Sequence, residues 1–521
     1  MRQSGHSVAR SNNGMVTSPH DVASEAGAKV LRRGGTAIEA VIAAGAALTV
    51  LYPHFCGLGG DAIWIVADRT GRRKTIMGVG QAAEHLPVLD AIPPRGPLSA
   101  LTTAALVDSW GQALQYSCEN WQGLESLATL LADAIGLAED GFPVSRSQKH
   151  WHEFRANEIT SWPGFEAHFV TEGIQRQPQL ASTLQRIALY GHREFYDGEL
   201  ARRIANGLEA AGSPIRLHDL QKTTAQMVDP VSTVYRGIEL LAPPPPSQGV
   251  TTLCIMGVLS NFDMADIDPS SAQFYHLCIE AVKQAFLERG AIADPDFVAQ
   301  ACGDWLSEAV LSRKAAAIDR GIAQPWPAVH QTGDTVYLAA VDNEGRCASV
   351  LQSTYYDWGS GVLLEDTGIL WQNRGAAFSV DPVSPNVLAP GKKPFYTLNP
   401  GIGLKDGKPH LLYGTQGADG QPQTLALLLS RLIDHGFDPL SALSAPRFLL
   451  GRTFSDVRDN LKIEASVGAD IIATLHAMGH ETIAIPALNA LAGQAGAIRM
   501  DGDGRIDGAH DPRSDGCAIG I

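Results

Sequence analysis

The sequence predicts an α+β protein in which β-sheet is covered on two faces by helices. Three observations support this fold class: a largely helical stretch over residues 101–297, hairpin-like strands after Pro327, and further helices toward the C-terminus. Helices, then strands, then helices again are expected when helical layers enclose a sheet. The 521 residues, 45% of them apolar and 18% charged, have a globular composition and exceed what one small core supports.

Helices are predicted where apolar residues recur three and four positions apart. The first helix is expected to begin at a cap formed by Ser18 or Asp21 and to end at Gly34 and Gly35. The second is largely apolar and ends at Pro53. The predicted helices span residues 21–31, 36–52, 124–137, 179–189, 272–287, 425–433 and 469–478.

Hairpins are predicted where two β-rich runs flank a short turn. These pairs are residues 62–67 with 74–79, 335–341 with 347–354, and 398–404 with 410–413. The proline run at residues 243–246 interrupts the helical region and must be extended.

Charge and composition exclude several classes of function. The formal net charge is −15, which leaves no electrostatic basis for binding nucleic acid. The seven cysteines include no C-x-x-C pair, so neither a zinc knuckle nor a disulfide framework is indicated. Residues 1–20 contain no apolar signal core, and the apolar run 40–52 is too short to cross a bilayer. We therefore expect a cytoplasmic protein without membrane contact.

Several familiar motifs fail on spacing. Residues 55–61 (FCGLGGD) lack G-x-G-x-x-G spacing and precede a strand, so a glycine turn is expected instead of a dinucleotide loop. Residues 501–507 lack the bidentate glutamate of a calcium loop and predict a surface turn. The chain has no H-E-x-x-H and no G-x-S-x-G, so neither a metal site nor a serine hydrolase is predicted.

Thr335 is a candidate nucleophile in the segment Gly333-Asp334-Thr335. A threonine hydroxyl needs a base, and the α-amine of an N-terminal threonine can provide one because it titrates near about 7.7–8.0. Such a threonine must first be uncovered by cutting the preceding bond, and Gly333 would allow the backbone geometry that the cut requires. Thr332 is a competing nucleophile.

Motifs in a fixed order along the chain support this interpretation. They are Ser18-Pro19-His20, Ala23-Ser24-Glu25-Ala26-Gly27, Arg33-Gly34-Gly35, Gly57-Leu58-Gly59-Gly60, Pro244-Pro245-Pro246-Ser247, Gly333-Asp334-Thr335, Trp358-Gly359-Ser360-Gly361, Gln372-Asn373-Arg374, Pro390-Gly391-Lys392-Lys393-Pro394, Ala445-Pro446-Arg447-Phe448 and Asp511-Pro512-Arg513-Ser514. Over residues 14–519 the chain resembles the γ-glutamyltranspeptidase-like family of N-terminal-nucleophile hydrolases.

The resemblance implies a four-layer αββα sandwich with additional helices, made as one precursor and cut between Asp334 and Thr335. The products would be a helix-rich large fragment, residues 1–334, and a small fragment, residues 335–521, which remain together as a heterodimer that could pair again. Thr335 would be the nucleophile, favoured over Thr332 by its spacing to the strand. Ser353 would hydrogen-bond the nucleophile. Gly417 and Ala418 would supply the backbone N–H groups of an oxyanion hole.

The sequence departs from the γ-glutamyl members of the family at their substrate clamp. Residues 78–87 contain no arginine, and residues 375–379 (GAAFS) contain no acid. A substrate ammonium without a partner is costly to bury, so glutamyl recognition should be weak. The remaining candidates for substrate contact are Arg374, Tyr355, Tyr396, Thr397 and Asn399. Arg374 could bind a carboxylate, or it could be structural and pair with an acid such as Asp357.

The resemblance therefore favours an amidohydrolase that acts on a small anionic amide and needs no cofactor. The branch that releases ammonia from oxamate in purine (allantoin) breakdown fits this expectation. A γ-glutamyl hydrolase or transpeptidase, or a cephalosporin acylase, is the alternative enzyme. A non-catalytic relative that stays uncut and acts as a scaffold is the alternative of another class.

Overall fold

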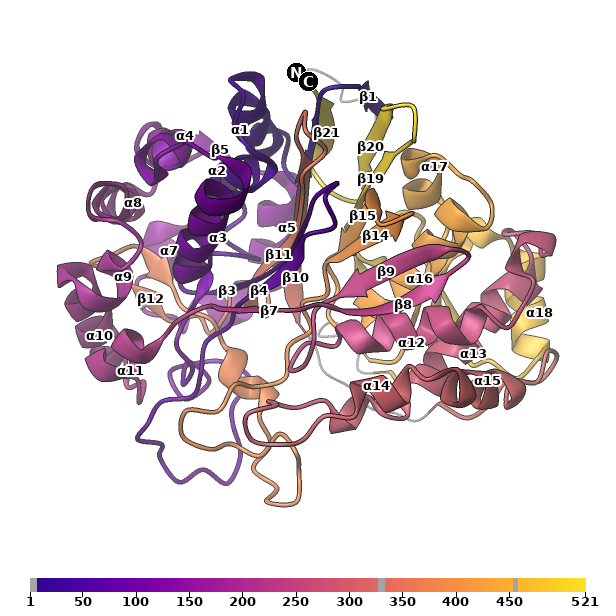
Figure 1. Cartoon of the computed structure of the whole chain (residues 1–521). Coiled ribbons are helices and arrows are strands. Elements are labelled where there is room, and N and C mark those ends of the chain that lie inside the picture. The colour runs from indigo at the N-terminus through magenta and orange to yellow at the C-terminus, as the bar shows by residue number, and fades with distance from the viewer. Residues whose placement is uncertain (1–6, 327–332, 453–457) are drawn as a thin grey trace.

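The computed structural model describes residues 7–326, 333–452 and 458–521. Its framework is two seven-stranded sheets, antiparallel throughout (Figure 1). The first sheet has the strand order β1 (Ala9–Ser11), β20 (Ile506–His510), β19 (Ala495–Met500), β15 (Lys408–Thr415), β14 (Gly401–Lys405), β9 (Ile238–Ala242) and β8 (Val231–Tyr235). The second has the order β21 (Cys517–Gly520), β2 (Met15–Ser18), β10 (Asp334–Val341), β11 (Cys347–Tyr355), β3 (Asp61–Ala67), β4 (Arg73–Gly78) and β7 (Gln226–Val228).

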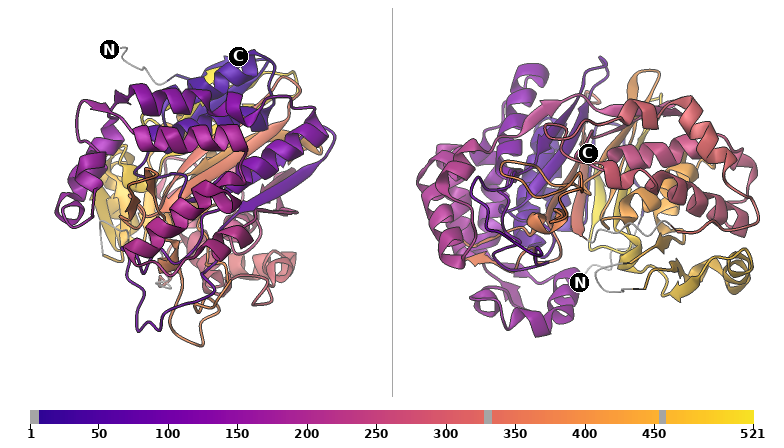
Figure 2. Two further views of the ribbon diagram at one scale, coloured as in Figure 1. Left: turned by 90° about the vertical axis from the view of Figure 1, so that its left-hand side faces the viewer. Right: turned by 90° about the horizontal axis from the view of Figure 1, so that it is seen from below.

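Helices cover the outer face of each sheet, and Figure 2 shows the strands lying between them. The second sheet is covered by helices from the first half of the chain, chiefly α1 (Asp21–Arg32), α2 (Ala37–Leu51), α3 (Leu106–Trp121), α4 (Leu127–Asp140), α8 (Pro178–Tyr190) and α10 (Glu199–Ala211). The first sheet is covered by α12 (Gly249–Leu259), α13 (Ala272–Phe286) and α16 (Gly420–Ile433). The predicted αββα sandwich is confirmed.

Smaller elements complete the layers. The further helices are α5 (Arg146–Phe154), α6 (Ala156–Ile159), α7 (Phe165–His168), α9 (Glu194–Asp197), α11 (Leu217–Lys222), α14 (Cys302–Trp305), α15 (Glu308–Ala316), α17 (Pro439–Ser444) and α18 (Ala469–Ala477). The minor sheets pair β5 (Phe142–Pro143) with β6 (Ile174–Gln175), β12 (Leu363–Leu364) with β13 (Ile369–Leu370), and β16 (Phe448–Leu450) with β17 (Leu461–Glu464) and β18 (Thr482–Ile485).

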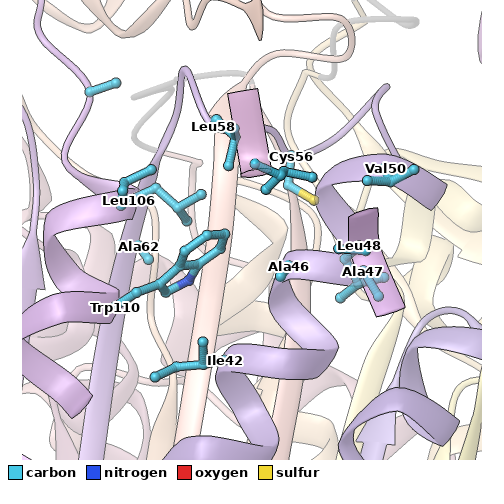
Figure 3. Packing of buried hydrophobic residues seen from close by; sticks show 14 of the residues in the cluster. Ile42, Ala46, Ala47, Leu48, Val50, Cys56, Leu58, Ala62, Leu106 and Trp110 are labelled. Atoms are coloured by element: carbon cyan, nitrogen blue, oxygen red, sulfur yellow. The ribbon is translucent and has the colours of Figure 1, made fainter. Parts of the chain in front are cut away.

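The second sheet packs against a hydrophobic core on each of its two faces. On β10, Val336 and Leu338 face the helices, whereas Tyr337 and Ala339 face the first sheet. Successive side chains of a strand point to opposite faces, so a strand buried on both faces is apolar throughout. On the helical side, Ile42 and Ala46 of α2 and Trp110 of α3 lie close to the sheet (Figure 3).

The predicted helices and hairpins are present, with differences at the ends of several elements. The N-cap of α1 is neither Ser18 nor Asp21 but His20, whose side chain accepts a hydrogen bond from the N–H of Val22. Ser18 lies in β2, and its hydroxyl bonds the carbonyl of His20. Residues 124–126 precede α4, and residues 398–400 precede β14. Both elements therefore start three residues later than predicted, whereas α16 starts five residues earlier, at Gly420.

Candidate active site

The predicted catalytic residues lie at one end of the interface between the two sheets. Ile63 of β3 and Leu351 of β11 belong to the core between the sheets. The two-residue period therefore places Asp61, Ser353 and Tyr355 on that same face. Ser353 pairs directly with Asp61 across the strands, so their side chains are neighbours.

The scissile peptide predicted from the sequence lies in a bulge of β10. Asp334 pairs with Tyr355, but the register shifts before Val336. A bulge redirects side chains, and bulges are common beside active sites. Thr335 is buried, and its Oγ1 donates a 2.6 Å hydrogen bond to the carbonyl oxygen of Asp334. In this uncut chain the hydroxyl therefore lies against the carbonyl group that it would attack.

Ser353 contacts the same carbonyl group. Its hydroxyl donates to the carbonyl oxygen of Asp334 and accepts a 2.7 Å hydrogen bond from the N–H of Tyr355. The resemblance suggested a contact with the hydroxyl of Thr335; in the uncut chain the two hydroxyls instead share one acceptor. A donor at that position would stabilise negative charge on the oxygen when the peptide bond is attacked. Thr332 lies outside the described residues.

Gly333 is required by the close approach of Tyr355. A β-carbon at Gly333 would lie 2.9 Å from two ring carbons of Tyr355. That distance is shorter than real contacts, and a buried aromatic ring cannot move aside easily. Tyr355 itself has φ of 81°, in the left-handed region that non-glycine residues rarely adopt. Backbone strain of this kind often accompanies functional sites.

The carboxyl group of Asp334 is buried beside the scissile bond. It accepts a hydrogen bond from the side-chain amide of Gln416, whose own oxygen accepts a 3.1 Å bond from the N–H of Gln494. Burial raises the pKa of Asp334 well above its usual range, and the charge of Asp357 raises it further. The neutral form of this acid is therefore favoured in the uncut chain.

Gly417 and Ala418 form the turn between β15 and α16. Gly417 has φ of 122° and Ala418 has φ of 45°. Among the described residues, the N–H groups of Gly417 and Ala418 have no hydrogen-bond acceptor. The side chain of Gln248 holds the turn by donating a 2.8 Å bond to the carbonyl of Ala418. Two unpaired N–H groups directly after Gln416 suit the predicted oxyanion hole.

Arg374 is fully buried between two tyrosine rings. Its guanidinium carbon lies 3.9 Å from the ring centre of Tyr355 and 4.5 Å from that of Tyr396. None of its three side-chain nitrogens has a hydrogen-bond partner among the described residues. Arg374 does not pair with Asp357, because Asp357 is bound by Arg95 and Arg155 at 2.8–3.0 Å.

The structure brings together only part of the predicted set of substrate contacts. Tyr355 and Tyr396 enclose Arg374. The side chain of Asn399 instead donates to the hydroxyl of Thr252 in α12. Thr397 is buried, and its carbonyl accepts a 2.8 Å bond from Gln248.

Sequence reasoning missed Asp61 and Gln416. Asp61 is buried and accepts a 2.8 Å hydrogen bond from the hydroxyl of Tyr396. Burial raises the pKa of Asp61 to about 6. One signal in the sequence could have pointed to Asp61: it follows a glycine turn and begins an apolar strand. Burying a carboxylate costs free energy, so an acid at such a position calls for a functional reason.

Two groups of side chains in the described part of the chain could approach a metal ion, and neither adjoins Thr335. In the buried group His276, Glu280 and His480, the ammonium of Lys283 already binds Glu280 at 2.8 Å, and the two histidines bind each other. The second group is Glu84, His218 and Asp219. Within the described segments, no helix is both long and apolar enough to span a membrane.

Comparison with known proteins gives consistent matches over nearly the whole chain. The model of the family described as gamma-glutamyltranspeptidase matches residues 23–521. An oxamate amidohydrolase proenzyme from Klebsiella pneumoniae subsp. pneumoniae is 43% identical over 99% of this chain and its own full length. The glutathione hydrolase-like YwrD proenzyme of Bacillus subtilis is 38% identical over 97% of this chain and 98% of its own.

A solved structure agrees with these sequence relatives. The cephalosporin acylase from Bacillus halodurans superposes with a TM-score of 0.90 at 30% identity, covering 99% of this chain and 97% of its own. Relatives described as proenzymes and a shared fold identify a self-processing amidohydrolase whose two subunits arise from one precursor. The chain belongs to the gamma-glutamyltranspeptidase family of N-terminal-nucleophile hydrolases.

Proposed function

We propose that this chain hydrolyses oxamate to oxalate and ammonia. The observation that carries the proposal is the buried guanidinium of Arg374, which lacks a hydrogen-bonding partner among the described residues. A buried charge without a partner is costly, and a planar carboxylate satisfies a guanidinium with two parallel hydrogen bonds. Oxamate offers a carboxylate directly beside its amide. The similarity to the Klebsiella oxamate amidohydrolase proenzyme supports this substrate.

The surroundings of Arg374 favour an anion without an ammonium group. The segment that the resemblance matches to the ammonium-binding acid of γ-glutamyl members, residues 375–379 (GAAFS), overlaps η3 (Arg374–Ala377) and contains no acid. Glutamyl substrates would leave that ammonium without a partner, whereas oxamate has none to satisfy.

Maturation would begin with attack of Thr335 Oγ1 on the carbonyl carbon of Asp334. The C–N bond breaks, the nitrogen takes the proton, and an ester joins the two fragments. Water hydrolyses the ester, which leaves the carboxylate of Asp334 and the free hydroxyl and α-amine of Thr335. The fragments would contain 334 and 187 residues and remain associated through their shared sheets.

Turnover would repeat the same chemistry on the substrate. With the carboxylate of oxamate on Arg374, Thr335 Oγ1 attacks the amide carbon while the α-amine takes its proton. The N–H groups of Gly417 and Ala418 would stabilise the oxyanion. Ammonia leaves with that proton, and water releases oxalate from the acyl-threonine ester. These groups need no cofactor.

Ammonia release tests the proposal. Matured protein should release ammonia from oxamate faster than from glutamine, and no release from oxamate would refute the assignment. Turnover of glutaryl-cephalosporins or γ-glutamyl anilides in preference to oxamate would favour the alternative acylase activity. Protein that stays uncut after long incubation would favour a scaffold. A role in purine breakdown in the cytoplasm goes with the oxamate proposal, and fractionation of cells and growth on allantoin test it.

A further inference from the structure

Asp61 and Tyr396 connect Arg374 to the catalytic end of the second sheet. The hydroxyl of Tyr396 donates to Asp61 Oδ2 at 2.8 Å, and its ring lies over the guanidinium. Asp61 also lies directly opposite Ser353 on the neighbouring strand, and the hydroxyl of Ser353 donates a hydrogen bond to the scissile carbonyl group. Asp61 and Arg374 are close enough to influence each other electrostatically, yet they form no hydrogen bond.

The other oxygen of Asp61 is fixed by the backbone. Asp61 Oδ1 accepts hydrogen bonds from the N–H groups of Gly80 at 3.0 Å and Ala105 at 2.9 Å. The carboxyl group therefore cannot rotate toward Arg374 without losing three hydrogen bonds. When ionised, it is a nearby negative charge that does not bind the guanidinium nitrogens, which have no hydrogen-bond partner among the described residues.

We propose that Asp61 is a positioning residue that couples binding of a substrate carboxylate at Arg374 to uptake of one proton by Asp61. Without a ligand, the positive charge of Arg374 favours ionised Asp61. A carboxylate bound to Arg374 cancels that charge and adds a like charge, so Asp61 becomes harder to ionise. The coupling is reciprocal, so protonated Asp61 strengthens binding of the carboxylate.

The groups around Asp61 determine at which pH it takes up the proton. Burial is the largest influence on its pKa and raises it to about 6, while Arg374 and the hydroxyl of Tyr396 lower it. The described charged, titratable and amide groups that act on Asp61 are Arg374, Tyr396, Tyr196, Gln372 and the N–H groups of Gly80 and Ala105. The α-amine of Thr335 appears only after the chain is cut, and its titration would govern kcat instead of substrate binding.

This inference rests on the proposed role of Arg374, and it predicts that KM for oxamate rises with pH. Below about pH 6, Asp61 is protonated in the free site and KM for oxamate is lowest. Above that pH, Asp61 is ionised in the free site and binding is accompanied by proton uptake, so KM rises until the pH reaches the pKa of the complex. If the bound carboxylate raises that pKa by about one unit, KM rises about tenfold.

Asp61→Asn removes the charge and keeps the hydrogen bonds. Its oxygen can still accept from Gly80 and Ala105, its amide can donate to the Tyr396 oxygen, and that hydroxyl can turn to the carbonyl of Gly80 at 3.3 Å. We expect a low KM without the rise above pH 6, while the pH profile of kcat keeps its shape. Asp68→Asn is the matched control, because Asp68 is a buried acid just beyond the other end of β3. A rise that persists in Asp61→Asn, or is absent from the unmodified protein, overturns the coupling.

Binding of oxalate separates this inference from the proposed function. Calorimetry of matured protein near pH 7, in buffers of different ionisation enthalpy, should show uptake of up to one proton, which Asp61→Asn abolishes. Uptake without any turnover of oxamate would refute the proposed function alone, and binding without uptake would refute the coupling alone. If Asp61→Asn does not mature, Tyr396→Phe removes one hydrogen bond to ionised Asp61 and should move the rise in KM to higher pH; an unmoved rise overturns the inference.

Discussion

Replacing Arg374 by methionine should remove recognition of the substrate carboxylate while leaving the tyrosine rings in contact with a side chain of similar length. Arg374 is fully buried, and none of its side-chain nitrogens has a described hydrogen-bond partner, so the substrate would be its main polar contact. A hydrogen bond to a charged group contributes about 1.5–3 kcal/mol to the free energy of binding, and a bidentate contact between guanidinium and carboxylate contains two such bonds. The expected loss of about 3–6 kcal/mol corresponds to a fall of roughly 10²–10⁴-fold in kcat/KM for oxamate.

The assay is steady-state ammonia release by matured protein, with a denaturing gel to show that Arg374→Met is still cut. Arg374→Lys keeps the charge but loses the planar fork, so it should fall between methionine and arginine. Oxalate binding, measured separately, should weaken in parallel because it uses the same carboxylate contact. If Arg374→Met keeps kcat/KM within about threefold, or if oxalate binds it normally, the guanidinium does not recognise a carboxylate.

Three further predictions concern maturation and stability. Gly333→Ala should slow self-cleavage because its β-carbon would lie 2.9 Å from the ring of Tyr355. Gly502→Ala is the control, because a β-carbon there would lie in open space and should leave the rate of self-cleavage unchanged. Equal rates of self-cleavage for the two variants on a denaturing gel would contradict this prediction. Ser353→Ala should slow self-cleavage by about 10²–10³-fold, the usual effect of losing one donor to a developing oxyanion, and a normal rate would exclude that role. Burial lowers the pKa of His168 to about 4, below its value near 6.5 in the unfolded chain. The free energy of unfolding should therefore fall by up to about 3 kcal/mol as the pH drops from 6.5 to 4. Over this pH range the melting temperature of His168→Phe should drop less than that of the unmodified protein, and an equal drop would contradict the role of His168.

Local patterns in the sequence were sufficient for the helices and the hairpins. The hairpin of β10 and β11 combines apolar runs with a turn at Asp342 and Gly345, so neighbouring residues specify it. Strand β19 contains one glycine and two alanines, which have little strand propensity. It is a strand because its neighbours require small residues: a β-carbon at Gly496 would lie 2.8 Å from the ring of Tyr337 in the other sheet. Such packing between sheets has no local signal.

The same distinction applies to the site. Thr335 and Arg374 were predicted because short motifs surround them. Asp61 and Gln416 were missed because their importance depends on strand register and on the folded chain. Asp61 lies opposite Ser353 on the neighbouring strand, and Gln416, directly after β15, reaches Asp334. The pair of Arg374 with Asp357, one of two alternatives, is absent because Arg95 and Arg155, distant in sequence, already bind that acid.

The N-terminal residue of the small fragment tests the central claim most directly. Purified protein should separate into two bands, and the small fragment should begin at Thr335 and contain 187 residues by intact mass. Thr335→Ala should remain a single chain without activity. A small fragment that begins at Thr332, or cleavage that persists in Thr335→Ala, would contradict the account of this site.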